Sequence, residues 1–341
     1  MALWTDIIDP ATLTGYTREA LADIERRRGT LARYLPNREV PNITVRFVKG
    51  QNGLAVEAKF RAYDAEPEVG KKPTAQRVVL ELPAIGQTIP VSEYEQLRTR
   101  GASDDVLLNQ IYDTARQVAQ AISDRMERLR AVVLRTGKAT IAEIAADDDF
   151  GRVAGHTVTA SALWNTAPSV SRLADLQTWS DTYEATNGVA PGAIVMSRRV
   201  ARSLAQGDEF KTSLVGGGSR PATVADVNSI IEGAGLPPIE VYTRRTQAGL
   251  VLPDNELLLL PEPVATDDWE GTQLGATFWG QTLTSQEPGW GIEDAEQPGV
   301  VAGVYRNEKP PMIAEVIGDA IGMPVLANAN LSFKATVLAA S

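Results

Sequence analysis

Residues 104–136 form the longest uninterrupted helical pattern in the sequence. Apolar side chains recur there at spacings of three and four, which is the periodicity of one face of an α-helix. They are Leu108, Ile111, Ala115, Val118, Ile122, Met126, Leu129 and Val133. Ser103 occupies a position typical of an N-cap, and Gly137 follows where a glycine can end a helix. At about 1.5 Å per residue the helix would be roughly 50 Å long, so we expect other elements to pack along it.

The opposite face of this predicted helix is polar. Acidic residues lie at its start and arginines lie towards its end, where the helix dipole favours charges of these signs. They are Asp104, Asp105, Arg128, Arg130 and Arg135. Nothing on the helix resembles a set of catalytic groups, which indicates an architectural role.

Composition removes several classes of function. The 341 residues include no cysteine and one histidine, which excludes disulfides, thiolate nucleophiles, cysteine-type zinc sites and nearly all histidine-based triads. No stretch of about 18 apolar residues could span a bilayer, and the first residues lack a signal-peptide pattern, so we expect no membrane partner and no export. The net charge of -10 disfavours strong binding to nucleic acid by the whole surface.

The residues before the long helix predict an arm and a β-ribbon. In residues 1–36, Thr17 can cap a helix whose thin apolar stripe must lie on another element. Between residues 43 and 91 apolar residues alternate, which predicts paired strands with a charged tip at 64–74. Because two strands without a covering layer cannot bury one face, the ribbon needs a partner surface, most simply a neighbouring copy of the chain.

The residues after the long helix predict a strand-rich segment, an α/β segment and a return to strands. Residues 138–164 are expected to be strand-rich. The expected helices are 170–186, 198–206 and 223–233, and the expected strands are 193–196, 239–243, 257–260, 300–305, 312–316 and 331–338. We expect the strands that follow the long helix and the C-terminal strands to share one sheet, with the α/β segment inserted between them. The predicted fold class is therefore α+β.

Candidate chemical groups are few, and none forms a set. His156 lies in an alternating strand and is most simply a partly buried residue, because no cysteine or second histidine can complete a site. The other candidates are most simply packing or solvated surface. They are Asp147–Asp149, Asp267–Glu270, Thr136–Lys138, Gly216–Ser219, Arg26–Arg28 and the aromatic residues Trp269, Phe278, Trp279 and Trp290. The sequence thus predicts no catalytic residue, no metal site and no cofactor.

Five segments, taken in order, carry a resemblance to a known family. They are AYDAEPEVGKKPTAQRVVLELPAIGQTIPVSEYEQL at 62–97, RMERLRAVVLRTGKATI at 125–141, GAIVMSRRVARSL at 192–204, QLGATFWGQT at 273–282 and PPMIAEVIGDAIGMPVLANANLSFKATVL at 310–338. In this order they resemble the major capsid proteins of tailed bacteriophages, which have the Hong Kong 97-type fold. The local sequence is most similar to the lambda-like branch, the major capsid protein E.

The resemblance implies a division of the chain into five parts. These are an N-terminal arm (1–36), an extended β-hairpin loop or E-loop (37–100), a peripheral domain with the spine helix (101–168, helix 104–136), an inserted α/β axial domain (169–298) and the C-terminal strands of the peripheral domain (299–341). The axial domain would gather around five-fold and six-fold axes, and the extended loop would lie over an adjacent subunit.

The same resemblance implies a structural protein without enzymatic activity. Pentamers and hexamers of it would form the icosahedral head shell around a double-stranded DNA genome, in the virion and, during assembly, in the host cytoplasm. The implied partners are further copies of the chain, a separate scaffolding protein, a portal, possible decoration proteins, and packaged DNA that is contacted weakly and without specificity.

Five residues are candidates for contacts between subunits: Lys71 and Lys72 at the loop tip, Arg128 on the polar face of the long helix, and Asn328 and Asn330 near the C-terminal strands. In some members of the family a loop lysine joins an asparagine of a neighbour through an isopeptide bond. Here the lysines lie in an exposed turn, where an ordinary ammonium group is a poor nucleophile, so a covalent link is the less favoured interpretation.

Two alternatives remain open from the sequence. One is an encapsulin-like shell that encloses cargo enzymes instead of DNA. The other is a soluble enzyme that acts through carboxylates, which predicts a compact monomer or small oligomer with a deep pocket.

Overall fold

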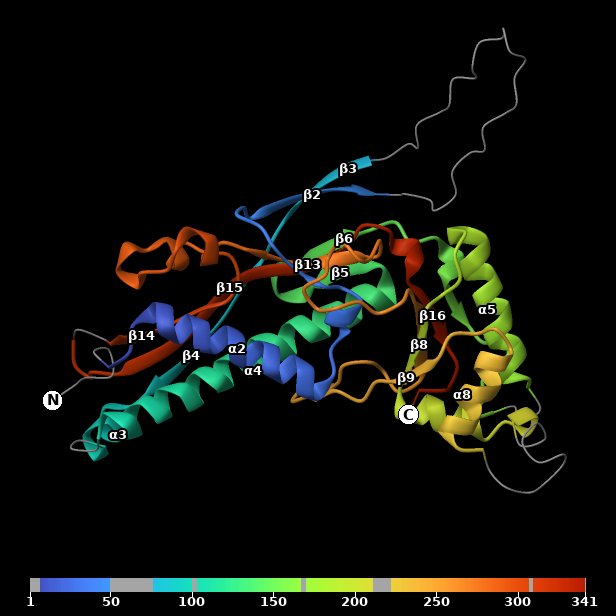
Figure 1. Ribbon diagram of the computed structural model, residues 1–341, viewed down its shortest axis with the longest axis horizontal. Coiled ribbons are helices and arrows are strands. Elements are labelled where there is room, and N and C mark those ends of the chain that lie inside the picture. The colour runs from blue at the N-terminus through green and yellow to red at the C-terminus, as the bar shows by residue number, and fades with distance from the viewer. Residues whose placement is uncertain are drawn as a thin grey trace, which may run out of the picture.

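The computed structural model describes residues 7–49, 76–99, 103–166, 170–210, 222–306 and 309–340. A long helix, α4 (Asp104–Thr136), runs along one β-sheet and ends beside a second, as Figure 1 shows. The other α-helices are α2 (Pro10–Arg28), α3 (Glu93–Arg98), α5 (Arg172–Asn187), α6 (Arg198–Ala205) and α8 (Val224–Gly233). Short 3-10 helices are η1 (Leu31–Arg33), η2 (Ala142–Ile144), η3 (Ala154–His156), η4 (Thr284–Gln286), η5 (Pro288–Trp290), η6 (Asp294–Glu296) and η7 (Ala329–Leu331).

Helix α4 has the predicted limits and the predicted apolar stripe. All eight stripe residues are buried except Leu108, which is half-buried. The helix ends at Gly137, whose φ of 70° lies in the left-handed region that glycine adopts without strain. Ser103 occupies the N-cap position, but its side chain makes no capping hydrogen bond, so this detail of the prediction is wrong.

Helix α2 begins earlier than the sequence analysis predicts. Its N-cap is Asp9, whose carboxylate accepts a hydrogen bond from the backbone N–H of Thr12 at 2.8 Å, and Pro10 lies in the first turn, where its missing N–H costs nothing. Thr17 is not a cap, because it lies inside the helix and its hydroxyl donates to the carbonyl of Leu13. As expected, the helix lies on other elements, namely α4 and strand β14 (Val301–Arg306).

The first sheet is built around one long strand. Its members are β1 (Asn37–Glu39), β4 (Ala84–Val91), β13 (Gly275–Gly280), β14 and β15 (Ala314–Leu326). Strand β15 pairs with β4 along one edge, and with β14 and then β13 along the other. Helix α4 packs closely on this sheet, because a Cβ atom on Gly318 would lie 2.3 Å from Cγ1 of Val118. Glycine is therefore required at this point of contact between helix and sheet.

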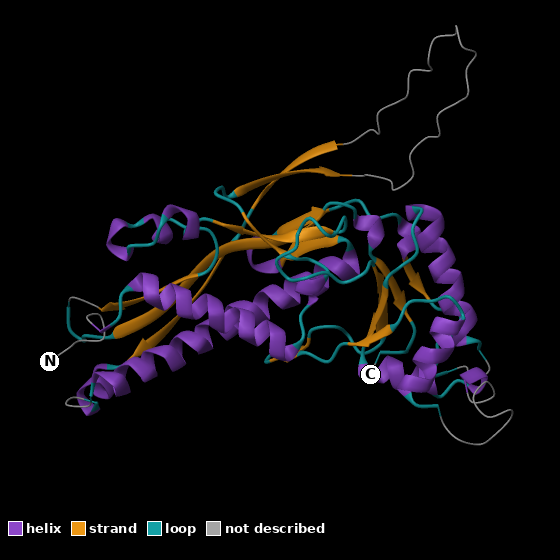
Figure 2. Ribbon diagram, in the orientation of Figure 1, coloured by secondary structure: helices purple, strands orange, loops and turns teal. Residues whose placement is uncertain are grey.

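The ribbon starts from this sheet, as Figure 2 shows in orange. Strands β2 (Thr44–Lys49) and β3 (Gln76–Glu81) pair antiparallel. Val45 and Leu80 lie opposite each other and are buried in the main core of the chain, so its own chain covers one face of the ribbon at its base. The prediction that the whole ribbon needs an external cover is therefore wrong at the base. The predicted tip at 64–74 lies outside the described residues.

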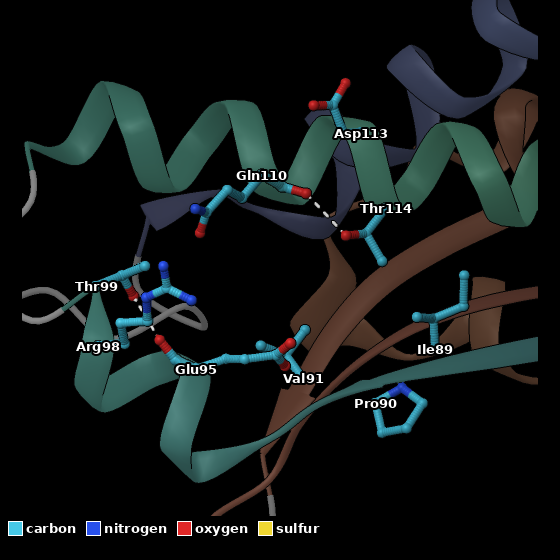
Figure 3. A pocket seen from close by; sticks show the side chains of 9 residues that line it. All are labelled: Ile89, Pro90, Val91, Glu95, Arg98, Thr99, Gln110, Asp113 and Thr114. Carbon is cyan, nitrogen blue, oxygen red and sulfur yellow. Dashed lines mark hydrogen bonds between the residues drawn. The ribbon is translucent and has the colours of Figure 1, made fainter.

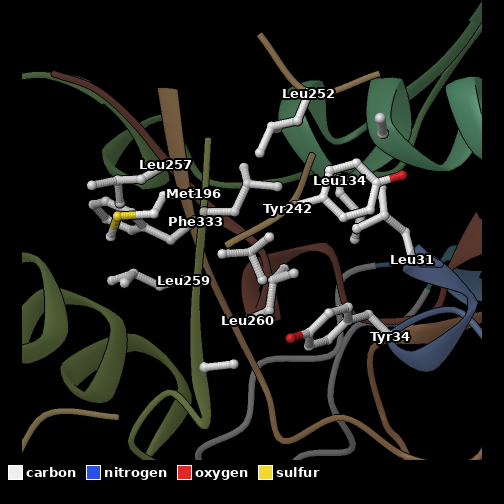
Figure 4. Packing of buried hydrophobic residues seen from close by; sticks show 14 of the residues in the cluster. Leu31, Tyr34, Leu134, Met196, Tyr242, Leu252, Leu257, Leu259, Leu260 and Phe333 are labelled. Carbon is white, nitrogen blue, oxygen red and sulfur yellow. The ribbon is translucent and has the colours of Figure 1, made fainter. Parts of the chain in front are cut away.

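The second sheet has the strand order β7 (Thr157–Thr159), β16 (Phe333–Thr336), β12 (Glu256–Leu260), β8 (Ala193–Met196) and β9 (Ile239–Val241). Strand β12 is buried on both faces, which suits its run of four leucines. Figure 4 shows Leu257 beside Met196 and Phe333, while Leu260 lies towards Tyr34 and Tyr242. In Figure 1 helices α5 and α8 lie beyond this sheet from α4.

The helices and strands predicted between residues 170 and 260 are confirmed, but the predicted sheet is wrong in part. Strands β7 and β16 lie side by side, as expected. However, β16 also pairs with β12, whereas β14 and β15 belong to the first sheet together with β13. The predicted boundary at residue 298 therefore does not separate the two sheets. Two hairpins complete the fold, β5 (Lys138–Ile141) with β6 (Ala146–Asp149), and β10 (Arg245–Thr246) with β11 (Gly249–Leu250).

Candidate functional site

A buried group of charged side chains joins α4 to the N-terminal part of the chain. The guanidinium of Arg130 is fully buried and lies 2.7 Å from Glu25 and 3.2 Å from Glu127. It also donates to Asn37 in β1 at 2.7 Å and to Thr277 in β13 at 3.0 Å. Burial alone lowers the pKa of Arg130, but the charges and hydrogen bonds of the two glutamates outweigh burial and raise it above its usual value. Arg130 is therefore a permanent cation.

Glu127 extends this group towards the second sheet. The hydroxyl of Tyr242, in the loop after β9, donates to Glu127 at 2.5 Å, and the backbone N–H of Leu31 donates to the same carboxylate at 2.7 Å. Arg244 lies 3.9 Å from Glu127 and 3.0 Å from Asp124. Burial and the charge of Glu127 raise the pKa of Tyr242, so its hydroxyl stays protonated and able to donate. We call Glu25, Glu127, Arg130, Tyr242 and Arg244 the ionic cluster.

The C-terminal end of α4 is fixed to the second sheet by a further set of ionic contacts. Arg135 donates to Glu256 in β12 at 2.9 Å, and Lys334 in β16 lies 3.0 Å from the same carboxylate. Arg152 donates to the carbonyl of Leu134 at 3.0 Å and so satisfies an orphan carbonyl of the helix end. Burial lowers the pKa of Arg152 to about 10, which leaves it charged at neutral pH.

The two sets of contacts hold α2, α4 and both sheets in one geometry. Their charged groups are mostly buried and paired with each other, so they leave no open position for a substrate. The chemistry that they support is structural.

The five predicted contact residues fall into three groups. Lys71 and Lys72 lie outside the described residues. Arg128 is half-buried, and its guanidinium bonds to the hydroxyl of Thr246 within the same chain. Asn328 and Asn330 are buried, and their side-chain oxygens accept hydrogen bonds from backbone N–H groups of the same chain. The two asparagines are thus used inside the subunit and do not support a contact with a neighbour.

The other candidate groups have structural surroundings. His156 lies in the 3-10 turn η3 and not in a strand, and it is fully buried between the rings of Tyr183 and Phe333. Asp147 and Asp149 lie 3.8 and 3.4 Å from the ammonium group of Lys138. Within the described ranges, no group of three acidic or histidine side chains could hold a metal ion, and no helix has the length and apolar character needed to cross a membrane.

The surface has shallow cavities and exposed apolar side chains. A cavity of about 560 Å³ lies between α3 and α4 around the end of β4, and Glu95, Arg98 and Asp113 are among the residues that line it (Figure 3). Helix α3 buries none of its residues, and Tyr94 on it is 73% exposed. Leu283, directly before η4, is 86% exposed. Single exposed apolar side chains are common on protein surfaces, so these two residues do not by themselves define an interface.

The sequence matches the model of a known protein family. The model of the family described as phage major capsid protein E matches residues 10–268, which is more than half of the chain. The chain belongs to this family. A phage major capsid protein is a structural component of the head shell and not an enzyme. No curated protein sequence matches this capsid protein.

Solved structures show the same fold. A protein assigned as a prophage capsid protein in E. coli CFT073 is 13% identical, with a TM-score of 0.63 over 97% of this chain and 99% of the other. A phage-related protein from Bordetella bronchiseptica RB50 is also 13% identical, with a TM-score of 0.59 over 98% and 99% of the two chains. The capsid protein of the cyanophage P-SCSP1u is 9% identical, with a TM-score of 0.50 over 92% and 89%. The Hong Kong 97-type fold predicted from the resemblance is confirmed.

This capsid protein therefore associates with copies of itself and forms the shell of a virion. The ionic cluster is not predicted from the sequence. Arg130 lies on the predicted polar face of the long helix, and Glu25 lies 105 residues before it in the predicted arm, where no partner was assigned to it. A signal was present, because a glutamate and an arginine at spacing three on a helix can pair, but this spacing does not reveal that the pair is buried.

Proposed function

We propose that this capsid protein assembles into pentamers and hexamers, and that these close into an icosahedral head around the double-stranded DNA of a tailed bacteriophage. The observation that carries the proposal is the β2–β3 ribbon. Within the described residues its strands pair only with each other. Its base is anchored by Val45 and Leu80, while Ile43 and Val79 are 52% and 60% exposed. An anchored ribbon with open edges and exposed apolar side chains is suited to lie on a neighbouring subunit.

The division of labour along the chain follows from this proposal. Residues 37–100 would supply the extended loop, and residues 101–168 with 299–341 would form the peripheral domain around α4. Residues 169–298 would gather around the five-fold and six-fold axes as the axial domain, and residues 1–36 would form the arm. The pairing of β13 with β15 supports a firm connection between the axial and peripheral parts.

Further partners belong to the same proposal. A separate scaffolding protein would direct assembly in the host cytoplasm, a portal would be a further partner of the shell, and decoration proteins could bind outside. The net charge of -10 supports weak contact with packaged DNA, because like charges repel. Lys71 and Lys72 remain candidates for the contact of the loop with a neighbour.

Electron microscopy of the purified full chain tests the proposal. We expect closed shells or separate pentamers and hexamers. Val79→Asp places a charge on the exposed face of the ribbon and should prevent shell formation without unfolding the chain, whereas Val153→Asp, at a valine that is 41% exposed in a turn, serves as the matched control. A compact monomer at all concentrations would contradict the proposal, and particles loaded with protein cargo would indicate an encapsulin-like nanocompartment.

A further inference from the structure

Strand β4 has one edge that no described residue occupies. It pairs with β15 along its other edge, from Ala84 to Val91. The sequence of β4 is AIGQTIPV, which contains no charged residue, and five of its eight residues are exposed. Proteins commonly protect such edges with charges, prolines or bulges, because unpaired N–H and C=O groups recruit another strand. Here only Pro90, near one end, has this effect.

The register of the sheet shows which backbone groups face the open edge. The N–H of Gly322 donates to the carbonyl of Pro83 at 3.0 Å, one step beyond the β4–β15 ladder. Hydrogen-bonded positions alternate along an antiparallel ladder, so the odd-numbered residues of β4 direct their N–H and C=O groups to β15. The even-numbered residues, which are Ala84, Gly86, Thr88 and Pro90, direct theirs to the open edge. The missing N–H of Pro90 thus falls on the open edge and not inside the sheet.

The side chains of β4 divide between two faces. Gln87 lies opposite Gly318, and a Cβ atom on Gly318 would meet Val118 of α4, so Gln87 lies on the face of the sheet that α4 covers. Ile85 and Ile89 share this face, because side chains alternate along a strand. Two open cavities of about 490 and 610 Å³ lie beside Gln87 and are lined by residues of both β4 and α4. A strand added at the open edge would direct its inward side chains towards these cavities.

We infer that β4 pairs with β4 of a second copy of this chain across a two-fold axis. The inference rests on the proposed function, because it names the partner of one surface in the shell. Every subunit carries this edge, so its occupant must be present in equal number, and the shell subunit itself meets that condition. A two-fold contact is isologous, which means that the same strand must complement itself.

Strand β4 meets this requirement when the register is centred on Gln87. Gly86 of each copy then lies opposite Thr88 of the other, and all four of their N–H and C=O groups face the open edge. Ala84 donates to the carbonyl of Pro90 in the other copy, whereas the carbonyl of Ala84 receives no hydrogen bond from Pro90, which has no N–H. On the inner face Ile85 lies opposite Ile89 of the other copy, an apolar cross-strand pair, and the two Gln87 amides meet at the axis.

Single cysteine variants test this register, because the natural chain has no cysteine. The two Gln87 residues would form a non-hydrogen-bonded pair with Cα atoms about 4.5 Å apart, within the range of a disulfide. We expect Gln87→Cys shells, after mild oxidation, to shift from monomer to dimer on denaturing gels without reductant. Thr88→Cys should stay monomeric, because Thr88 lies opposite Gly86, and the exposed Leu283→Cys controls for random oxidation.

The outcomes separate this inference from the proposed function. If the unmodified chain forms no shells or capsomers, the proposed function fails. If shells form and Gln87→Cys remains monomeric, or links no more than Leu283→Cys, the β4 pairing is wrong. Linkage of Thr88→Cys instead would overturn the register centred on Gln87. Should Gln87→Cys not assemble, a density map of unmodified shells decides, since solvent or a different segment beside β4 would refute the pairing.

Discussion

Replacing Arg130 by methionine is the most direct test of the ionic cluster. Methionine is also a good helix former, so the helix itself is little affected. However, the buried carboxylates of Glu25 and Glu127 lose the cation that lies 2.7 and 3.2 Å from them. Removing one partner of a buried ion pair costs about 3–5 kcal/mol, because the other charge stays buried without compensation. We expect Arg130→Met to destabilise the unassembled chain by this amount.

The expected change in melting temperature follows from the length of the chain. Unfolding entropy of about 2.1 cal/mol/K per residue gives about 0.7 kcal/mol/K for 341 residues. A loss of about 3–5 kcal/mol therefore lowers the melting temperature by about 4–7 °C. Calorimetry or tryptophan fluorescence of the unassembled chain, at concentrations too low for assembly, measures this shift.

Arg128→Met is the matched control, two residues earlier on the same helix. Arg128 is half-buried and bonds to Thr246 and, at 3.5 Å, to the carbonyl of Gly249, so its loss should cost only about 0.5–1.5 kcal/mol. Adding Glu25→Gln to Arg130→Met removes one buried carboxylate charge that has lost its partner, and it should therefore restore part of the lost free energy of unfolding. Equal melting temperatures for Arg130→Met and Arg128→Met would refute the assignment of Arg130 as a paired, buried cation.

Three further predictions concern other parts of the fold. Burial, together with the charge of the nearby Arg152, lowers the pKa of His156 below its ordinary value of 6.5. The unfolded chain therefore takes up the proton first, and the free energy of unfolding decreases as the pH falls below about 6.5. Urea unfolding at pH values of about 7.5 and 5.5 should show this loss in the natural chain and much less of it in His156→Phe, which keeps the aromatic packing. Arg152→Met leaves the last carbonyls of α4 without a charged donor and should lower the free energy of unfolding by about 1.5–3 kcal/mol in the same assay. An unchanged free energy of unfolding would show that water can replace Arg152 as the donor. Gly318→Ala forces a Cβ atom against Val118 and should lower stability by about 1–3 kcal/mol, whereas Gly155→Ala, where nothing lies within 4 Å, should be neutral; equal effects would show that the sheet yields under α4.

The long helix could be predicted from the sequence because its signal is repeated many times. Its eight apolar positions agree on one face, and Gly137 marks its end. The leucines of β12 and the apolar run of β8 predict buried strands for a similar reason. Elements whose evidence lies within a few consecutive residues are thus found with nearly correct limits. The start of α2 could also be predicted, because Asp9 and Pro10 are typical of an N-cap and a first turn. The choice of Thr17 as the cap instead placed the predicted start too late.

Pairings between distant segments could not be predicted in the same way. Strand β13 joins β15 through contacts such as that of Phe278 with Met323, and the sequence alone does not say which of several apolar strands is the partner. The burial of Arg130 was missed for the same reason. A charged residue is assigned to a solvated face unless its partners are known, and Glu25 and Asn37 become partners only after α2 and β1 fold back onto α4.

The position of the ionic cluster fits the task of a shell subunit. A buried ion pair is often no more stabilising than apolar residues of the same size, so stability alone does not account for one at this place. Its hydrogen bonds do, however, have fixed directions, and those of Arg130 and Glu127 reach α2, β1, β13 and the loop that follows β9. A closed shell requires each subunit to present its surfaces at a set angle, because small errors add up around the shell. We therefore interpret the ionic cluster as the group that fixes the angle between the two sheets. The β4 edge is then the surface through which the first sheet fixes the orientation of the neighbouring subunit.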